Sequence, residues 1–164
     1  MNVVAEKQEN TETKNKRYRR SPRVDEKVQR TIQTIEETLV NSIQSITFRE
    51  LNGYQRKAIQ KHFEHIQEYR IKTYRERDNV IMKVYPIGQL KRLAEQKTQE
   101  VLMKGKPEAL PPMGSFERFV IHDYLKEREG IKTESFGEEG KDRHIEICPL
   151  FGRTLKKANK KLTR

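Results

Sequence analysis

The sequence lacks several features on which common classes of protein depend. Its one cysteine, Cys148, excludes an intramolecular disulfide framework and a cysteine-based zinc site. No apolar run approaches the roughly 20 residues that a membrane-spanning helix requires. The first residues are polar and charged and contain no apolar stretch of signal-peptide length. We therefore expect a protein of a reducing compartment, the cytoplasm, without a membrane span.

Familiar catalytic motifs are missing as well. The sequence has no phosphate-binding Walker loop, no Gly-x-Gly-x-x-Gly and no Ser-His-Asp signature. His62 and His65 are three residues apart, but no matching constellation of carboxylates and histidines is evident, so they are better explained as residues of the surface or of the edge of the core. Glu138 and Glu139 stand in a glycine-flanked turn with no nucleophile nearby. These absences predict a protein that is not an enzyme and that uses no cofactor and no metal.

Acidic residues are in short supply: 24 against 35 lysines and arginines, for a formal net charge of +11. Such a balance makes nucleic acid the first partner to consider and a membrane surface the second. The excess lies at the two ends, because residues 1–23 carry +4, residues 150–164 carry +6 and residues 24–149 only +1. The ends would then supply sequence-independent attraction to phosphates, and the body would supply any selectivity. Alternatively, the ends serve only solubility.

The apolar residues predict the same series of elements twice. The elements predicted for the first unit are a helix over 24–42, a strand over 46–51, a helix over 54–67 and strands over 69–74 and 80–85. Those predicted for the second unit are a helix over 90–104, an extended segment over 109–113, a helix from Ser115 and strands over 131–136 and 143–148. A shift of 62 residues places Leu51 on Met113, Tyr54 on Phe116 and Arg56 on Arg118.

This repetition predicts an α/β (α+β) fold of two tandem helix–strand–helix–strand–strand units. We assign residues 24–86 to a degenerate first repeat and residues 87–149 to the second unit, with disordered basic ends over 1–23 and 150–164. A unit of about 60 residues is near the lower limit for an independent core. We therefore expect the units to pack together or to share a strand, with the strand over 80–85 able to join either sheet.

Arg118 and His122 are the residues most suggestive of binding. They are four residues apart in the helix that begins at Ser115, so they lie on one face. We expect both side chains to be exposed, with Phe119, Val120 and Leu125 turned into the core. Arg118 would then hold a phosphate with two hydrogen bonds, and His122 would stack on a base or bind phosphate when protonated.

The residues around this pair resemble a known domain. The stretch from Leu110 to Leu125 (LPPMGSFERFVIHDYL), together with TESFGEE at 133–139 and RHIEI at 143–147, is similar to an Arg-three-His domain, and most similar to that of the bacterial Jag (SpoIIIJ-associated) family. The resemblance implies a small α/β domain that binds single-stranded nucleic acid, most readily RNA. Two departures stand out: the Gly-x-x-Gly loop of a KH domain is absent, and the first repeat keeps Arg56 but has Gln60 in place of the histidine.

These observations together predict a non-enzymatic regulatory protein that binds single-stranded RNA or DNA. The proposed binding face consists of Arg118, His122, Lys126, Lys132 and Arg143, and a weaker second strip consists of Arg56, Lys57 and Lys61. Two alternatives remain open at this stage. The protein is a DNA-binding regulator that uses its basic ends on a duplex, or it is a protein–protein adaptor whose first repeat has become a docking surface.

Overall fold

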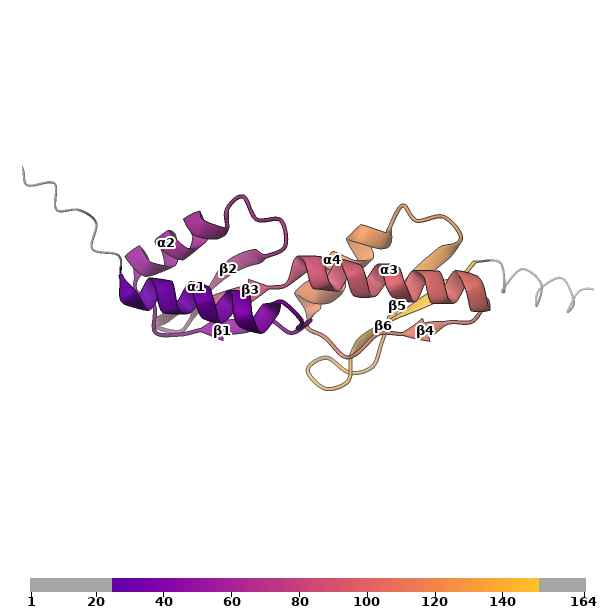
Figure 1. Cartoon of the computed structure of the whole chain (residues 1–164). Helices are drawn as coiled ribbons and strands as arrows, with labels where there is room; N and C mark the ends of the chain where they lie inside the picture. Colours follow the sequence, from indigo (N-terminus) through magenta and orange to yellow (C-terminus); the bar gives the residue numbers. More distant parts are fainter. Residues whose placement is uncertain (1–24, 151–164) are drawn as a thin grey trace, which may run out of the picture.

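The computed structural model describes residues 25–150 (Figure 1). The two basic ends predicted to be disordered therefore lie outside the described residues, apart from Leu150. Four helices and six strands follow one another along this part of the chain. Their bounds are α1 (Glu26–Leu39), β1 (Ile46–Phe48), α2 (Gly53–Phe63), β2 (Arg70–Glu76), β3 (Asn79–Tyr85), α3 (Ile87–Lys104), β4 (Glu108–Ala109), α4 (Ser115–Leu125), β5 (Ile131–Phe136) and β6 (His144–Pro149).

The strands form two small antiparallel sheets with the same internal order. In the first sheet β3 lies between β1 and β2, and in the second sheet β6 lies between β4 and β5. Two helices accompany each sheet, and Figure 1 shows the two resulting units side by side along the molecule. The mixed helix and strand fold is thus the one that the sequence predicts, with the same order of elements in each half.

β1 is shorter than the strand predicted over 46–51, and the segment predicted to be extended over 109–113 overlaps a strand, β4, only at Ala109. β1 ends at Phe48 because Leu51 leaves the sheet to enter the core, and Asn52 then caps α2. β4 covers only two residues because Pro111 and Pro112 have no N–H to donate. The backbone next to these prolines still forms hydrogen bonds with β6. The Leu110 N–H, for example, donates to the Ile145 carbonyl at 2.8 Å.

The helix ends follow local capping rules. The Asp25 carboxylate accepts from the Lys27 N–H at the start of α1, and Asn52 and Gln55 form a reciprocal capping box at the start of α2. α3 ends at Gly105, whose φ of +65° is a left-handed conformation that glycine adopts without strain. None of the helices within residues 25–150 combines the length and the apolar character needed to cross a bilayer.

Each unit has its own hydrophobic core. The first contains Val28, Ile35, Leu39, Leu51, Ile59, Phe63, Met82 and Val84. The second contains Leu90, Ala94, Val101, Leu110, Ile121, Leu125, Ile131, Ile145 and Ile147. The sheets share no strand within the described residues, because β3 pairs only with β1 and β2. Of the two arrangements expected from the sequence, the units therefore adopt the one in which they pack together.

Apolar and aromatic side chains join the two units. β3 ends at Tyr85 and α3 begins at Ile87, so the link between the units is one residue long. Ile43, from the loop before β1, packs against the core of the second unit. The Tyr85 ring lies edge-on to the Phe116 ring of α4, with centroids 4.5 Å apart.

Polar contacts cross the same junction. Glu68 and Arg92 form an ion pair with 2.7 Å between Oε2 and Nη2, and the Ser45 hydroxyl donates to Glu117 at 2.9 Å. The Gly88 N–H donates to the Glu68 carbonyl at 3.0 Å. Contacts from several segments of the first unit thus hold α3 and α4 of the second unit in one orientation.

We predict that the two cores unfold in one transition. Ile59 and Ile121 are fully buried, one in each core, so Ile59→Ala and Ile121→Ala should each lower the free energy of unfolding by about 2–5 kcal/mol. Urea denaturation followed by circular dichroism measures this loss. Met103→Ala, at a site that is 86% exposed, is the control and should change stability by less than about 0.5 kcal/mol. Two separate transitions in the core variants would contradict the coupling of the units.

Candidate nucleic-acid interface

Arg118 is buried, and this overturns the prediction that its guanidinium faces solvent. Its side chain is only 9% exposed. Nη1 donates to the Met113 carbonyl at 2.7 Å, and Nη2 donates to the Glu139 carboxylate at 2.6 Å. The guanidinium therefore fastens the segment that precedes α4 to the turn between β5 and β6. A charged group that is held in this way does not meet a phosphate in the manner that the sequence suggested.

Glu139 is the group that the prediction missed. Its carboxylate also lies 3.6 Å from Nε of Arg143, so one acid is shared by two of the five residues of the predicted binding face. The turn that carries Glu139 is closed by Asp142, whose carboxylate accepts from the Glu138 N–H at 2.8 Å. Gly137 permits this turn with a φ of +88°. Arg143 is half-buried, and its Nε is shielded from solvent.

Arg56 has the same role in the first unit. Its Nη1 donates to the carbonyl of Leu51, five residues earlier, just as Arg118 binds the carbonyl of Met113. The arginine that the two repeats share is thus tied to the backbone that enters a helix in both. Lys57 and Lys61, the other members of the predicted second strip, are exposed on α2 and enter no ion pair among residues 25–150.

His122 is half-buried between α4 and β5. Nδ1 lies 2.7 Å from the Thr133 hydroxyl, and Nε2 lies 2.9 Å from the Ser135 hydroxyl. A hydroxyl either donates or accepts, so these partners suit the neutral ring as well as the cation. Burial, and secondarily the positive charge of Arg118, lower the pKa of His122 below its usual value of 6.5. The ring is therefore mostly neutral at pH 7 and offers hydrogen bonds more than charge.

The remaining two cations of the predicted face lie close to His122 in the fold. Lys126 caps the C-terminal end of α4 and is exposed. Lys132, on β5, is half-buried and forms an ion pair with Glu134. Of the five predicted residues, the structure brings His122, Lys126 and Lys132 together around one hollow.

That hollow has a volume of about 510 Å³ and lies between α4 and β5. Its lining consists of Phe119, His122, Asp123, Leu125, Lys126, Ile131, Lys132 and Thr133. An exposed aromatic ring, an imidazole and two ammonium groups therefore border the same space. This combination suits a nucleotide, since the ring stacks on a base and the cations attract phosphate.

Phe119 differs from its prediction in the opposite sense to Arg118. It was expected in the core, but its side chain is 60% exposed. A signal was available: Phe119 precedes His122 by three residues, and residues at that spacing share a helix face. Leu125, predicted to point inward on the same helix, is buried.

Metal binding finds no support within residues 25–150, where no group of three histidine, cysteine or carboxylate side chains is arranged to hold an ion. His62 instead lies 3.4 Å from the Glu36 carboxylate and edge-on to the Phe63 ring. His65 is exposed, and Cys148 is buried.

Comparison with known proteins identifies the second unit. Residues 88–149 match the family of Arg-three-His domains, which confirms the resemblance that the sequence motifs indicate. The chain is also 47% identical over 55 residues to the RNA-binding protein KhpB of Lactiplantibacillus plantarum. That match covers 34% of this chain but only 16% of the relative.

Arg118→Ala should destabilise the protein rather than remove only a ligand contact. The substitution leaves the Met113 carbonyl without its donor and frees the turn at Glu139, so we expect a loss of about 1–3 kcal/mol in the free energy of unfolding. Urea denaturation measures it. Glu139→Gln should cost less, because Glu139 is 59% exposed and the bond from Arg118 to Met113 remains. An unchanged stability in Arg118→Ala would contradict a structural role.

The lowered pKa of His122 predicts a pH-dependent stability. A histidine whose pKa is lower in the folded state binds protons more readily when unfolded, so stability falls as pH drops below about 6.5. Unfolding free energy measured between pH 7.5 and 5.5 should decline in the native protein. In His122→Gln this part of the decline should be absent. A decline of equal size in both proteins would show that another group is responsible.

Proposed function

We propose that this chain, whose residues 88–149 match the Arg-three-His domain family, is a non-enzymatic regulatory protein that binds single-stranded RNA through the hollow between α4 and β5. The observation that carries the proposal is the meeting of exposed Phe119 with His122, Lys126 and Lys132 around that hollow. The similarity to a relative named as an RNA-binding protein supports RNA as the ligand.

Each side chain would have a distinct part in binding. Phe119 provides a face on which a base stacks, and stacking of this kind contributes about 1–3 kcal/mol per base. Lys126 and Lys132 attract the phosphates on either side, with Lys132 exchanging Glu134 for the ligand. His122, neutral at pH 7, donates or accepts a hydrogen bond at the edge of the hollow. Arg118 and Arg143 are positioning residues that hold the turn at Glu139 against α4.

A single strand fits this surface better than a duplex does. The recognition elements are a ring and a hollow, which require an unstacked base, whereas a duplex offers its phosphates and groove edges. The near-neutral body also leaves little general attraction for a duplex. We propose a cytoplasmic location, and we propose that the basic ends add affinity for phosphates without selecting the sequence.

Phe119→Ala should weaken binding of a single-stranded RNA oligonucleotide about 10-fold or more, because the stacking face is lost. The ring is 60% exposed, so the fold should be little affected. Fluorescence anisotropy with a labelled 12-nucleotide RNA gives the Kd, and Phe119→Tyr, which keeps an aromatic face, should bind like the native protein. If Phe119→Ala binds as tightly as Phe119→Tyr, the ring is not a stacking face.

Lys126→Ala with Lys132→Ala should weaken the same binding more than Lys57→Ala with Lys61→Ala. Both double variants remove two positive charges, but only the first pair borders the hollow. Equal losses would mean that net charge alone attracts the RNA.

Competition between single-stranded RNA and duplex DNA of equal charge tests the ligand class, and tighter binding of the duplex would favour a DNA-binding regulator. Absence of RNA binding even at low salt would favour a protein–protein adaptor.

A further inference from the structure

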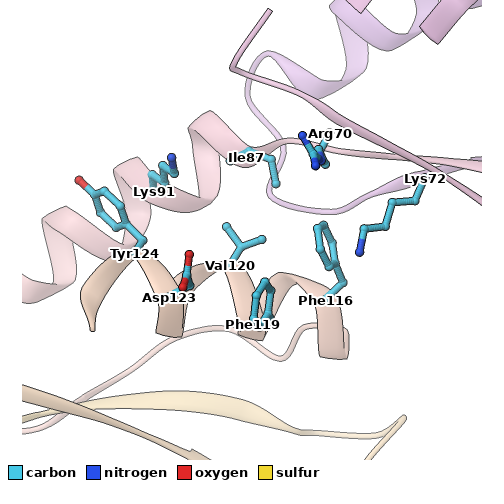
Figure 2. A pocket seen from close by; sticks show the side chains of 9 residues that line it. All are labelled: Arg70, Lys72, Ile87, Lys91, Phe116, Phe119, Val120, Asp123 and Tyr124. Atoms are coloured by element: carbon cyan, nitrogen blue, oxygen red, sulfur yellow. The ribbon is translucent and has the colours of Figure 1, made fainter. Parts of the chain in front are cut away.

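A second hollow lies at the junction of the two units, where β2 of the first unit approaches α3 and α4 of the second (Figure 2). Its volume is about 610 Å³, which exceeds that of the hollow beside His122. It is lined by Arg70, Lys72, Ile87, Lys91, Phe116, Phe119, Val120, Asp123 and Tyr124. Neither unit forms this space alone, because Arg70 and Lys72 come from β2 and the aromatic residues come from α4.

The lining combines cations with aromatic rings. Arg70 and Lys91 are exposed, and neither they nor Lys72 enter an ion pair among residues 25–150. Lys72 instead places Nζ 3.6 Å from the centre of the Phe116 ring, and Lys91 places Nζ 5.4 Å from that of Tyr124. Figure 2 shows the Lys72 side chain extending from β2 towards Phe116. These three cations are thus available to an anionic ligand.

The two hollows border the same stretch of α4. Phe119 and Asp123 line both, one hollow extending towards β5 and the other towards β2. The Phe116 and Phe119 rings are stacked with centroids 6.2 Å apart. The aromatic faces of Phe116 and Phe119 on α4 therefore have cations from β2 and α3 on one side and from β5 on the other.

Asp123 is the one acidic side chain among the described residues that line the junction hollow. Against three cations it leaves a net positive charge there, so phosphate remains attracted. Its carboxylate can accept a hydrogen bond from the amino group of a base that stacks beside it. The acid is thus compatible with a nucleotide as the ligand.

We propose that the junction hollow is a second nucleotide subsite, so that one RNA strand crosses from the Arg-three-His domain onto the first unit. This inference rests on the proposed function, because the strand is the one held beside His122. The first unit then acts by extending the path with Arg70 and Lys72, although it lacks the histidine of the second repeat. The contacts of Glu68 with Arg92 and of Tyr85 with Phe116 keep the two halves of the subsite together.

The test compares two charge-matched variants of the full chain. Arg70→Ala with Lys91→Ala removes two cations from the junction hollow. Arg75→Ala with Lys106→Ala removes two exposed cations that line neither hollow and that enter no ion pair among residues 25–150. Affinity is measured by fluorescence anisotropy for RNAs of 4 and 12 nucleotides over a range of salt concentrations.

For the 12-nucleotide RNA, the junction variant should bind about 10-fold more weakly than the control variant. Its plot of log K against log salt should be shallower than that of the control by about 1.4, the value for two phosphate contacts on a single strand. For the 4-nucleotide RNA, which is held in the hollow beside His122, the two variants should be equal.

The outcomes separate the inference from the function on which it rests. If Phe119→Ala weakens binding but the junction variant matches its control at both lengths, the second subsite is wrong and the proposed function stands. If the native protein binds no single-stranded RNA at low salt, the proposed function fails, and the subsite fails with it. A photoreactive 12-nucleotide RNA that crosslinks to Phe116 or Tyr124 would add support, whereas crosslinks confined to β5 and the end of α4 would oppose the subsite.

Discussion

The bond pattern of one buried arginine determines how the second unit presents its surface. Arg118 joins the Met113 carbonyl, just before α4, to the Glu139 carboxylate in the turn after β5. This bridge and the burial of Ile121 and Leu125 in the core together favour one rotation of α4 about its axis. That rotation puts Ile121 in the core, His122 against the hydroxyls of β5 and Phe119 in solvent. The arginine that gives the Arg-three-His domain half of its name thus acts here on the fold, and the neighbouring residues form the surface.

The first unit has the same arginine–carbonyl hydrogen bond but different residues on the surface of its helix. Arg56 donates to the Leu51 carbonyl as Arg118 donates to the Met113 carbonyl. In both units the arginine therefore has a structural role, because it ties its helix to the backbone that precedes that helix. The histidine position is occupied by the exposed Gln60, and no bridging carboxylate is paired with Arg56 among residues 25–150. A unit can therefore keep the fold while its binding residues change, because separate residues serve the two purposes.

In the proposed second subsite the first unit contributes side chains from β2 and none from its own helices. Lys72 and Tyr85 contact Phe116 of the second unit, and Arg70 lies nearby on the same strand as Lys72. The one-residue link between β3 and α3 leaves little freedom for the units to separate. Surfaces from two sheets are thereby combined along one helix, which neither repeat would offer by itself.

Most of the secondary structure was predictable from the sequence, because helical and strand periodicity are local properties. The spacing of Ile32, Ile35 and Leu39 sufficed for α1, and the alternation of Val80, Met82 and Val84 sufficed for β3. The repeat and the resemblance to an Arg-three-His domain were also visible as linear patterns. The strand over 46–51 was predicted too long, because Leu51 takes a core position instead of pairing in the sheet.

The sequence by itself determined the α/β class, the order of the elements, the family of the second unit and the residues from which a binding face would be drawn. The tertiary structure alone decided which of these residues meet solvent. Glu139 is 21 residues from Arg118 in the chain, and Arg70 is 46 residues from Phe116, so no local pattern relates them. Burial and ion pairing depend on such distant partners, and for that reason Arg118 turned inward while Phe119 became part of the surface.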